Sequence, residues 1–138
     1  MTKVSIKGVL LGGVVDVLSS LIFGVLFAVL VIVFFHVFGR VPHKTVTASP
    51  LFETSLIMIG VAGSTLGGFV AARLAKHDEL LNAGLSSYLC VLLGIYEWSR
   101  GIDHSPSYAQ ALLMISGPVF SLLGGYLRLR QNQLGRLE

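Results

Sequence analysis

The sequence is poor in cysteine and in charge, and both shortages narrow the class of protein. Cys90 is its single cysteine, so an internal disulfide framework is excluded. Only 12% of the residues are charged, against about a quarter in ordinary soluble domains, and 54% are hydrophobic. A water-soluble fold of this composition would lack a polar surface, so we predict that lipid is the solvent for most of the chain. Cys90 lies in an apolar run and is interpreted as a small buried hydrophobe.

The motifs that usually mark catalytic, metal and nucleotide sites are also missing. The sequence contains no Gly-rich phosphate loop, no Cys or His pair at zinc spacing and no nucleophile elbow. No serine has a histidine at a matching depth that could act as its base. The net charge of +3 comes from basic residues at the ends of apolar runs, not from a basic patch with interleaved aromatics. We therefore expect no enzyme, no catalytic residue, no metal or other cofactor, and no nucleic-acid partner.

Four apolar runs of membrane-spanning length follow one another along the chain. They predict helices at residues 8–38, 50–75, 79–98 and 106–128. Nineteen residues separate Asp16 from His36, close to the roughly 20 that cross a hydrocarbon core. The first run is longer than the roughly 7–15 apolar residues of a signal peptide, so we interpret it as an uncleaved helix. The predicted fold class is all-α, a membrane-embedded four-helix bundle that forms one domain over residues 1–138.

Helix-start signals support two of these boundaries and suggest a third. Ser49-Pro50 and Ser105-Pro106 each place a serine at the N-cap and a proline at the first helical position, where its missing N–H costs nothing. Asp78, in a charged turn, can cap the helix that follows it. These signals separate the four helices by short polar connections.

The distribution of lysine and arginine predicts the orientation of the bundle. On one side of the predicted membrane lie seven basic residues, which are Lys3, Lys7, Arg73, Lys76, Arg128, Arg130 and Arg136. The other side has three, which are Arg40, Lys44 and Arg100. Because cytoplasmic segments carry the excess of positive charge, we predict that both termini are cytoplasmic.

Small residues recur at four-residue spacing on the first, second and fourth predicted helices. In lipid, helices associate through close backbone contact and hydrogen bonds, and small residues permit that contact. We predict close helix packing at a set of glycines, which are Gly12, Gly24, Gly63, Gly67, Gly68, Gly117, Gly124 and Gly125.

The stripes on the second and fourth helices resemble each other. Ser64-Thr65-Leu66-Gly67-Gly68-Phe69 aligns with Ser121-Leu122-Leu123-Gly124-Gly125-Tyr126. One interpretation is a pair of helical hairpins related by an axis along the membrane normal, a parallel repeat. The other is coincidence among helices rich in glycine and leucine.

An aspartate in a Gly/Val-rich first helix and a second helix that ends Gly67-Gly68-Phe69-Val70-Ala71-Ala72-Arg73 form a wider pattern. This pattern resembles one found among uncharacterised prokaryotic small four-transmembrane-helix membrane proteins, over about the first two-thirds of the chain. The resemblance implies a multi-pass protein of the prokaryotic plasma membrane, a cell membrane protein. It implies no activity.

Asp16 and Arg73 are the charged residues for which the sequence predicts a structural ion pair. Each marks the same end of its 19-residue span, so both are expected at one depth. Alternatively, both lie separately at the interface, with Arg73 snorkelling to the surface. The helical periodicity adds a condition: if the Gly60/Gly67/Ala71 stripe packs on the first helix, Arg73 points away from Asp16.

The remaining polar residues of the spans fall into two groups. His36, Glu53, Glu97 and His104 lie near one predicted membrane boundary and are interpreted as interfacial helix ends, because no two have ligand spacing on one helix. A second group predicts either interhelical hydrogen bonds or a polar path, and its members are Asn82, Ser86, Ser87 and Tyr88.

The most prominent feature of the sequence is its stripes of small residues, which predict helix–helix contact surfaces. We therefore expect a non-catalytic integral membrane protein that acts through association with itself, as a homo-oligomer, or with another membrane subunit. The alternative is a minimal transporter or channel formed by an oligomer, because four helices enclose little room. In both cases the lipid bilayer is the immediate partner.

Overall fold

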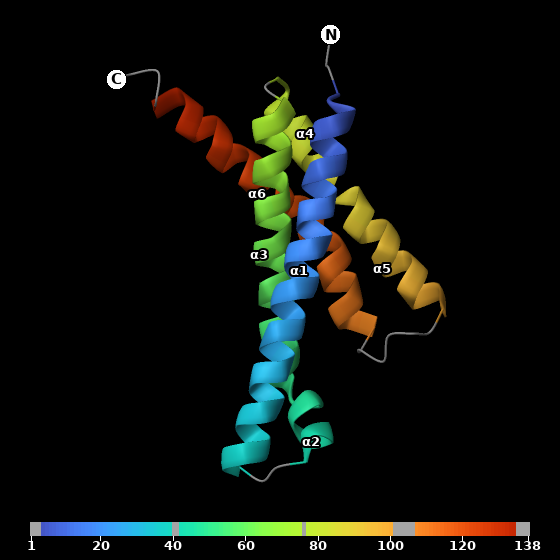
Figure 1. Cartoon of the computed structure of the whole chain (residues 1–138). Coiled ribbons are helices and arrows are strands. Elements are labelled where there is room, and N and C mark those ends of the chain that lie inside the picture. Colours follow the sequence, from blue (N-terminus) through green and yellow to red (C-terminus); the bar gives the residue numbers. More distant parts are fainter. Residues whose placement is uncertain (1–3, 40–41, 76, 101–106, 135–138) are drawn as a thin grey trace.

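The computed structural model describes residues 4–39, 42–75, 77–100 and 107–134, and the fold is all-α, as predicted. Figure 1 shows the arrangement. In chain order the elements are α1 (Ile6–Phe34), a π-helical turn η1 (Phe35–Gly39), α2 (His43–Thr47), α3 (Pro50–Ala75), α4 (Glu79–Ser86), α5 (Tyr88–Arg100) and α6 (Ser107–Leu134).

Helix α3 begins where the Ser-Pro signal predicts. The Ser49 hydroxyl accepts a hydrogen bond from the backbone N–H of Phe52 at 3.3 Å, and Pro50 is the first helical residue. Asp78 is the N-cap of α4, but its side chain makes no capping bond and its φ of 44° is left-handed. The predicted start at Ser105-Pro106 lies outside the described residues.

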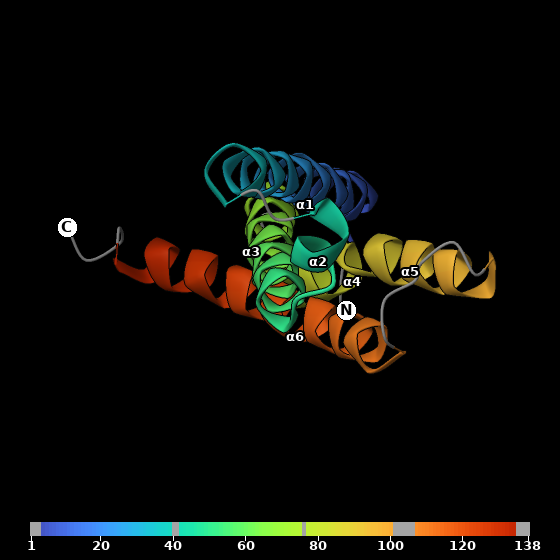
Figure 2. The same ribbon diagram turned by 90° about the horizontal axis from the view of Figure 1, so that it is seen from below.

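The third predicted helix is divided into α4 and α5 at Ser87. The Ser86 and Ser87 hydroxyls donate to the carbonyls of Ala83 at 2.7 Å and Gly84 at 2.9 Å, each three residues earlier. Such back-bonding competes with the helical ladder and bends helices. The same back-bonding occurs at Ser55 and Thr65 in the continuous α3, so it does not by itself account for the break. Helix α5 leaves the direction of α4 and diverges from α1 and α3 (Figures 1 and 2).

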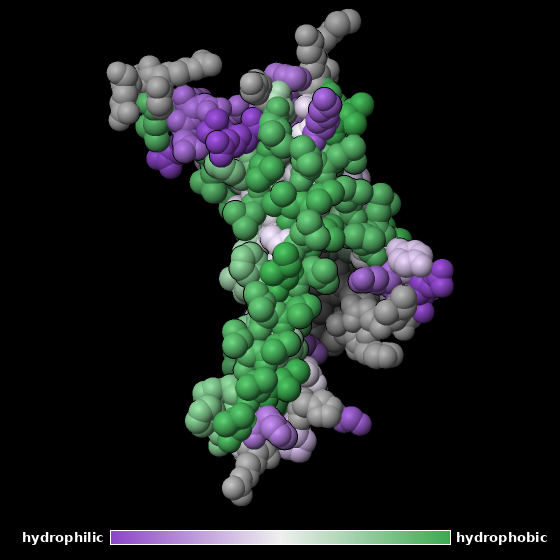
Figure 3. Space-filling view, in the orientation of Figure 1, coloured by the Kyte–Doolittle hydropathy of each residue, from purple (hydrophilic) through white to green (hydrophobic). Residues whose placement is uncertain are grey.

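Three stretches are long and apolar enough to cross a membrane: Ile6–Gly39, Pro50–Ala75 and Glu79–Arg100. Figure 3 shows apolar side chains over the visible face, with hydrophilic ones gathered toward its ends. The start of α1, the α3–α4 turn and the end of α6 lie at one end of the molecule, and α2 lies at the other (Figure 1). The fourth predicted span forms α6, although it is not among the three candidate spans found in the described residues.

The centre of the molecule is made of small residues where α3 crosses α1 and α6. A Cβ on Gly12 would lie 2.7 Å from the Gly67 carbonyl oxygen, and one on Gly67 would lie 2.7 Å from that of Gly12. One turn away, a Cβ on Gly63 would meet the Ser20 hydroxyl. The α1–α3 backbones thus approach as closely as glycine allows.

The two similar segments of α3 and α6 cross each other. A Cβ on Gly68 would strike the Ser121 carbonyl, one on Gly124 would strike the Thr65 carbonyl, and one on Gly125 would lie 2.5 Å from the Ala83 Cβ. The two segments that resemble each other in sequence therefore contact each other in the structure. That the two hairpins form a parallel repeat stays a prediction.

Gly24 and Gly117 differ from the other predicted packing glycines. The nearest atoms to a Cβ at these positions are the Leu56 Cδ2 at 3.9 Å and the Ser64 hydroxyl at 3.8 Å, which are ordinary contact distances. Within the described part of the chain, no close helix contact requires glycine at either position.

Candidate functional site

Asp16 is fully buried at the α1–α3 crossing, and its carboxyl group is hydrogen-bonded to one hydroxyl. The Ser64 hydroxyl lies 3.0 Å from one carboxyl oxygen of Asp16 and 3.3 Å from the other. A Cβ on Gly67 would lie 2.6 Å from the Asp16 Cβ, so this glycine makes the room in which the carboxyl group sits. A buried ionisable residue within a membrane span is a functional hypothesis by default.

The structure does not bring Asp16 and Arg73 together. Arg73 is exposed, whereas Asp16 is buried and bonds Ser64. The stripe that contains Gly67 and Ala71 packs on α1, and this turns Arg73 to the other side of α3. Arg73 also lies six residues beyond Gly67, which itself contacts Asp16, so the two side chains differ in depth by more than one helical turn.

We expect Ser64→Ala to destabilise the protein by about 2 kcal/mol, because the Asp16 carboxyl group would lose its hydroxyl partner while buried. Arg73→Ala should change stability by less than about 0.5 kcal/mol, since its side chain is exposed. Unfolding in mixed micelles measures both. Two results would contradict this assignment and support an Asp16–Arg73 ion pair instead. One is that Arg73→Ala destabilises the protein as much as Ser64→Ala does. The other is that Arg73→Asp restores the stability lost in Asp16→Arg.

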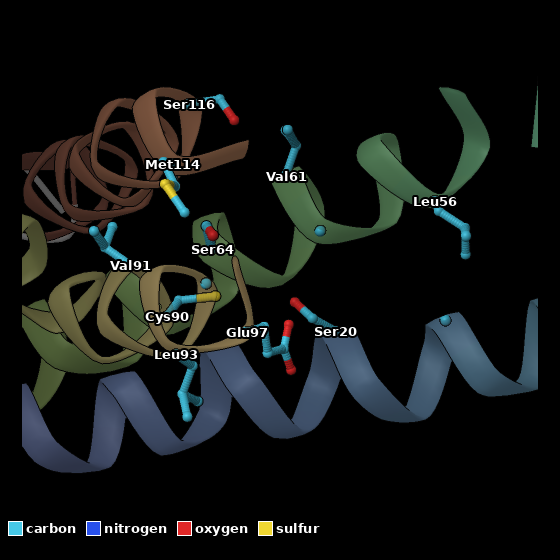
Figure 4. Close-up of a pocket in the computed structure, with 14 residues that line it drawn as sticks. Ser20, Leu56, Val61, Ser64, Cys90, Val91, Leu93, Glu97, Met114 and Ser116 are labelled. Atoms are coloured by element: carbon cyan, nitrogen blue, oxygen red, sulfur yellow. The ribbon is translucent and has the colours of Figure 1, made fainter. Parts of the chain in front are cut away.

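Beside the hydrogen-bonded Asp16 and Ser64 lies a cleft of about 300 Å³ between α1, α3, α5 and α6 (Figure 4). It opens where α5 diverges from the bundle. Most of its wall is apolar, and its lining residues include Leu56, Val61, Val91, Leu93 and Met114. The glycines without close helix contacts, Gly24 and Gly117, also line it.

The polar groups of the cleft lie on opposite walls. Ser20 and Ser64 come from α1 and α3, and Glu97 and Cys90 come from α5. The Ser20 hydroxyl oxygen is buried and has no hydrogen-bond partner among the described residues. Figure 4 shows the Glu97 carboxylate and this hydroxyl turned into the same space. Cys90, which is partly exposed, lies within electrostatic range of both Asp16 and Glu97.

Three of the four residues of the second predicted polar group make hydrogen bonds within the chain, and Tyr88 is the exception. Asn82, Ser86 and Ser87 are fully buried, whereas Tyr88 is 59% exposed. Ser121 donates to the Ala83 carbonyl at 2.5 Å and lies 3.1 Å from the Ser86 hydroxyl, which joins α4 to α6. None of the four residues lines the cleft, so they form no continuous polar path with it.

Asn82 connects three segments. Its side-chain oxygen accepts from the Ser5 N–H at 2.7 Å, and its amide donates to the carbonyls of His77 at 3.1 Å and Asp78 at 3.0 Å. These bonds hold the start of α1 against the α3–α4 turn. Of the two interpretations of this polar group, interhelical hydrogen bonds and a polar path, the Asn82 contacts correspond to the first.

The described residues give the site apolar surface and a few polar groups. Within the described ranges, no three His, Cys, Asp or Glu side chains are grouped so as to hold a metal ion. His36 is exposed, and His104 lies outside the described residues. The cleft offers apolar walls, one carboxylate and hydroxyl groups.

Glu97, Cys90 and Ser20 are the residues whose place in the cleft the sequence analysis missed. The sequence alone predicts an interfacial helix end at Glu97 and a buried hydrophobe at Cys90. A signal was present, because positions 90, 94 and 97 fall on one helical face, and all three line the cleft.

Comparisons of the chain with protein-family models, curated proteins and solved structures gave no match.

Proposed function

We propose that this chain is a non-catalytic integral membrane protein that acts through helix–helix association with a second copy of itself or with another membrane subunit. Four spans, at α1, α3, α4–α5 and α6, with both termini cytoplasmic, are part of the proposal. The common end shared by the start of α1 and the end of α6 supports an even number of crossings (Figure 1). The excess of lysine and arginine at that end supports the orientation.

The observation that carries the proposal is the exposure of α5. No residue of α5 is buried. Its face opposite the cleft presents Tyr88, Leu92 and Tyr96 at four-residue spacing, each at least 50% exposed. Six of the eight predicted packing glycines are in close contact within the chain, and α5 keeps an exposed face for a partner.

Purified in mild detergent, the protein should form a defined oligomer or carry a second membrane subunit. For an oligomer, Leu92→Ala with Tyr96→Ala should weaken association about tenfold or more, because two large side chains leave the interface. The matched control is Leu21→Ala with Val25→Ala, an exposed pair at the same spacing on α1. Light scattering of the detergent complexes gives the mass. A monomer without partners, or equal effects of the two double variants, would contradict the proposal.

A minimal transporter or channel formed by an oligomer is the second candidate. Two features favour it: the cleft and the interruption of the α4–α5 span at Ser87, since transporters place substrate sites at broken helices. Liposomes with the reconstituted protein separate the two functions. Protein-dependent flux of a solute would favour the transporter, and silent liposomes with a stable oligomer would favour association alone.

A further inference from the structure

The last turns of α6 run across one end of the bundle instead of continuing along it. A Cβ on Gly125 would lie 3.5 Å from the Glu79 carbonyl oxygen, and seven residues later the Asn132 side chain donates to the Glu79 carboxylate at 2.8 Å. Seven residues advance a helix by about 10.5 Å, so this part of α6 passes the first turn of α4 obliquely. Figures 1 and 2 show the end of α6 projecting sideways from the other helices.

This end of α6 lies at the level of a polar boundary of the molecule. The α3–α4 turn beside it contains His77 and Asp78, both exposed, and Glu79 follows them. Figure 3 shows hydrophilic side chains gathered over the end of α6 and apolar ones over α1 and α3 below it. Residues 126–134, which we call the α6 arm, therefore lie where the apolar interior of a bilayer gives way to headgroups.

One face of the α6 arm is apolar and turned away from the protein. Gly125, Leu129 and Asn132 mark the side of α6 that lies against the α3–α4 turn and α4. At 100° per residue, Leu127 and Leu134 fall on the opposite side, where they are 45% and 58% exposed. Covering exposed leucine with apolar surface is favourable, and the acyl region of the bilayer supplies that surface.

The charges of the α6 arm have one sign. It contains two arginines and no aspartate or glutamate. Arg130 is exposed and lies between the two leucines on the outward face. Arg128 already donates to the Gln131 side chain at 2.9 Å and its Nε is buried, so Arg130 is the arginine that is available to a ligand. Glu79, the carboxylate that contacts the arm, lies on its inner side.

We propose that the outward face of the α6 arm binds anionic phospholipid at the membrane surface. Leu127 and Leu134 lie among the upper acyl segments, and the Arg130 guanidinium donates to the oxygens of the headgroup phosphate. The bond between Asn132 and Glu79 holds the arm in this position. The inference goes beyond the association function and does not depend on it.

Other surroundings satisfy fewer of these groups. In water, both leucines stay exposed. A zwitterionic lipid covers the leucines, but its own ammonium group offsets the attraction between its phosphate and Arg130. An anionic lipid covers the leucines and neutralises the arginine together, and a basic residue at an anionic surface is favourable for that reason.

Lipid binding to the full chain in non-ionic detergent tests the role of Arg130. Native mass spectrometry measures the first bound molecule of phosphatidylglycerol or of phosphatidylcholine with identical acyl chains. Phosphatidylglycerol should bind at least about fivefold more tightly, and Arg130→Gln should remove about that factor without changing phosphatidylcholine binding. The matched control is Arg73→Gln, because Arg73 is an exposed arginine in the last turn of α3, at the same end of the molecule. Both side chains are exposed, so both variants should fold, which gel filtration verifies.

The depth of the arm is measured independently in liposomes. With Cys90 replaced by alanine, a nitrobenzoxadiazole label is attached to Leu134→Cys or, as the matched control, to Gln133→Cys. The two positions are adjacent but face about 100° apart on the helix. A lipid spin-labelled at an upper acyl carbon should quench the label at residue 134 at least about twofold more than the label at residue 133.

Equal affinity for the two lipids would overturn the proposal, and so would equal losses in Arg130→Gln and Arg73→Gln. Equal quenching at residues 133 and 134 would show that the outward face lies in water or against another protein instead of lipid. The mass of the detergent complex reports separately on association, so failure of the lipid proposal and failure of the association proposal are distinguishable.

Discussion

Gly124→Ala is expected to destabilise the protein by about 3 kcal/mol or more and to disrupt the α3–α6 crossing. The added methyl group would strike the Thr65 carbonyl and lie 2.8 Å from the Phe69 backbone nitrogen. Both neighbours are backbone atoms of a packed helix, so they cannot move aside as a flexible side chain would. Unfolding of the purified protein in mixed micelles measures the loss.

Gly24→Ala is the matched control for this prediction. Its methyl group would make only an ordinary contact, 3.9 Å from Leu56, so stability should change by less than about 1 kcal/mol and can increase, because alanine favours the helix. Gly117 is less suitable, since it precedes Pro118 in α6. Equal destabilisation by Gly124→Ala and Gly24→Ala would show that the α3–α6 crossing is not as close as described.

Asn82→Leu should produce a loss of similar size, about 3 kcal/mol. The replacement removes the Asn82 side-chain partner of the Ser5 N–H and of the His77 carbonyl, and each group left buried and unsatisfied costs about 1–3 kcal/mol. The Asp78 carbonyl loses one bond but keeps the one from the Asn82 backbone N–H. These bonds are partly buried, so water replaces some of them. Asn82→Asp separates the contributions, because it retains an acceptor for Ser5 but brings a carboxylate oxygen to two carbonyls.

Asn132→Leu is the comparison for Asn82. Among the described residues, the Asn132 side chain donates to Glu79 at 2.8 Å and so connects α6 to α4. Its replacement should cost about 1 kcal/mol. If the Asn82 and Asn132 variants unfolded alike, Asn82 would not hold the start of α1 against the α3–α4 turn.

The boundaries of α3 could be predicted from the sequence because they rest on local chemistry. Ser49 and Pro50 fix its start without help from the rest of the fold. The close packing of Gly67 and Gly68 was also predictable in kind, since small residues allow backbones to approach in lipid. What each glycine meets depends on other helices.

The choice of partner for each stripe could not be predicted. Gly67 and Gly68 are adjacent, so they face different sides of α3, and the structure gives the first to α1 and the second to α6. The sequence shows both packing surfaces of α3 but does not indicate which helix contacts each of them. The Asp16–Arg73 prediction failed at this point, because its geometry requires the opposite assignment.

The cleft escaped prediction for a different reason. The α4–α5 span is broken at Ser87, and the break gives α5 its own direction. Periodicity alone fits an unbroken span equally well, and in an unbroken span Glu97 is an interfacial residue. Its position in a cleft becomes evident only once α5 is seen to diverge from α3 and α6.

The central claim is that six of the eight predicted packing glycines are used within one chain, at crossings that join α1, α3, α4 and α6. The most direct measurement is oxidation of the pair Ser86→Cys and Ser121→Cys in native membranes, with Cys90 replaced by alanine. The two hydroxyl oxygens lie 3.1 Å apart across α4 and α6, which places the paired sulfurs within reach of a bond. We predict rapid loss of both thiols in a species of monomer size. A disulfide-linked dimer, or thiols that stay free, would contradict the account.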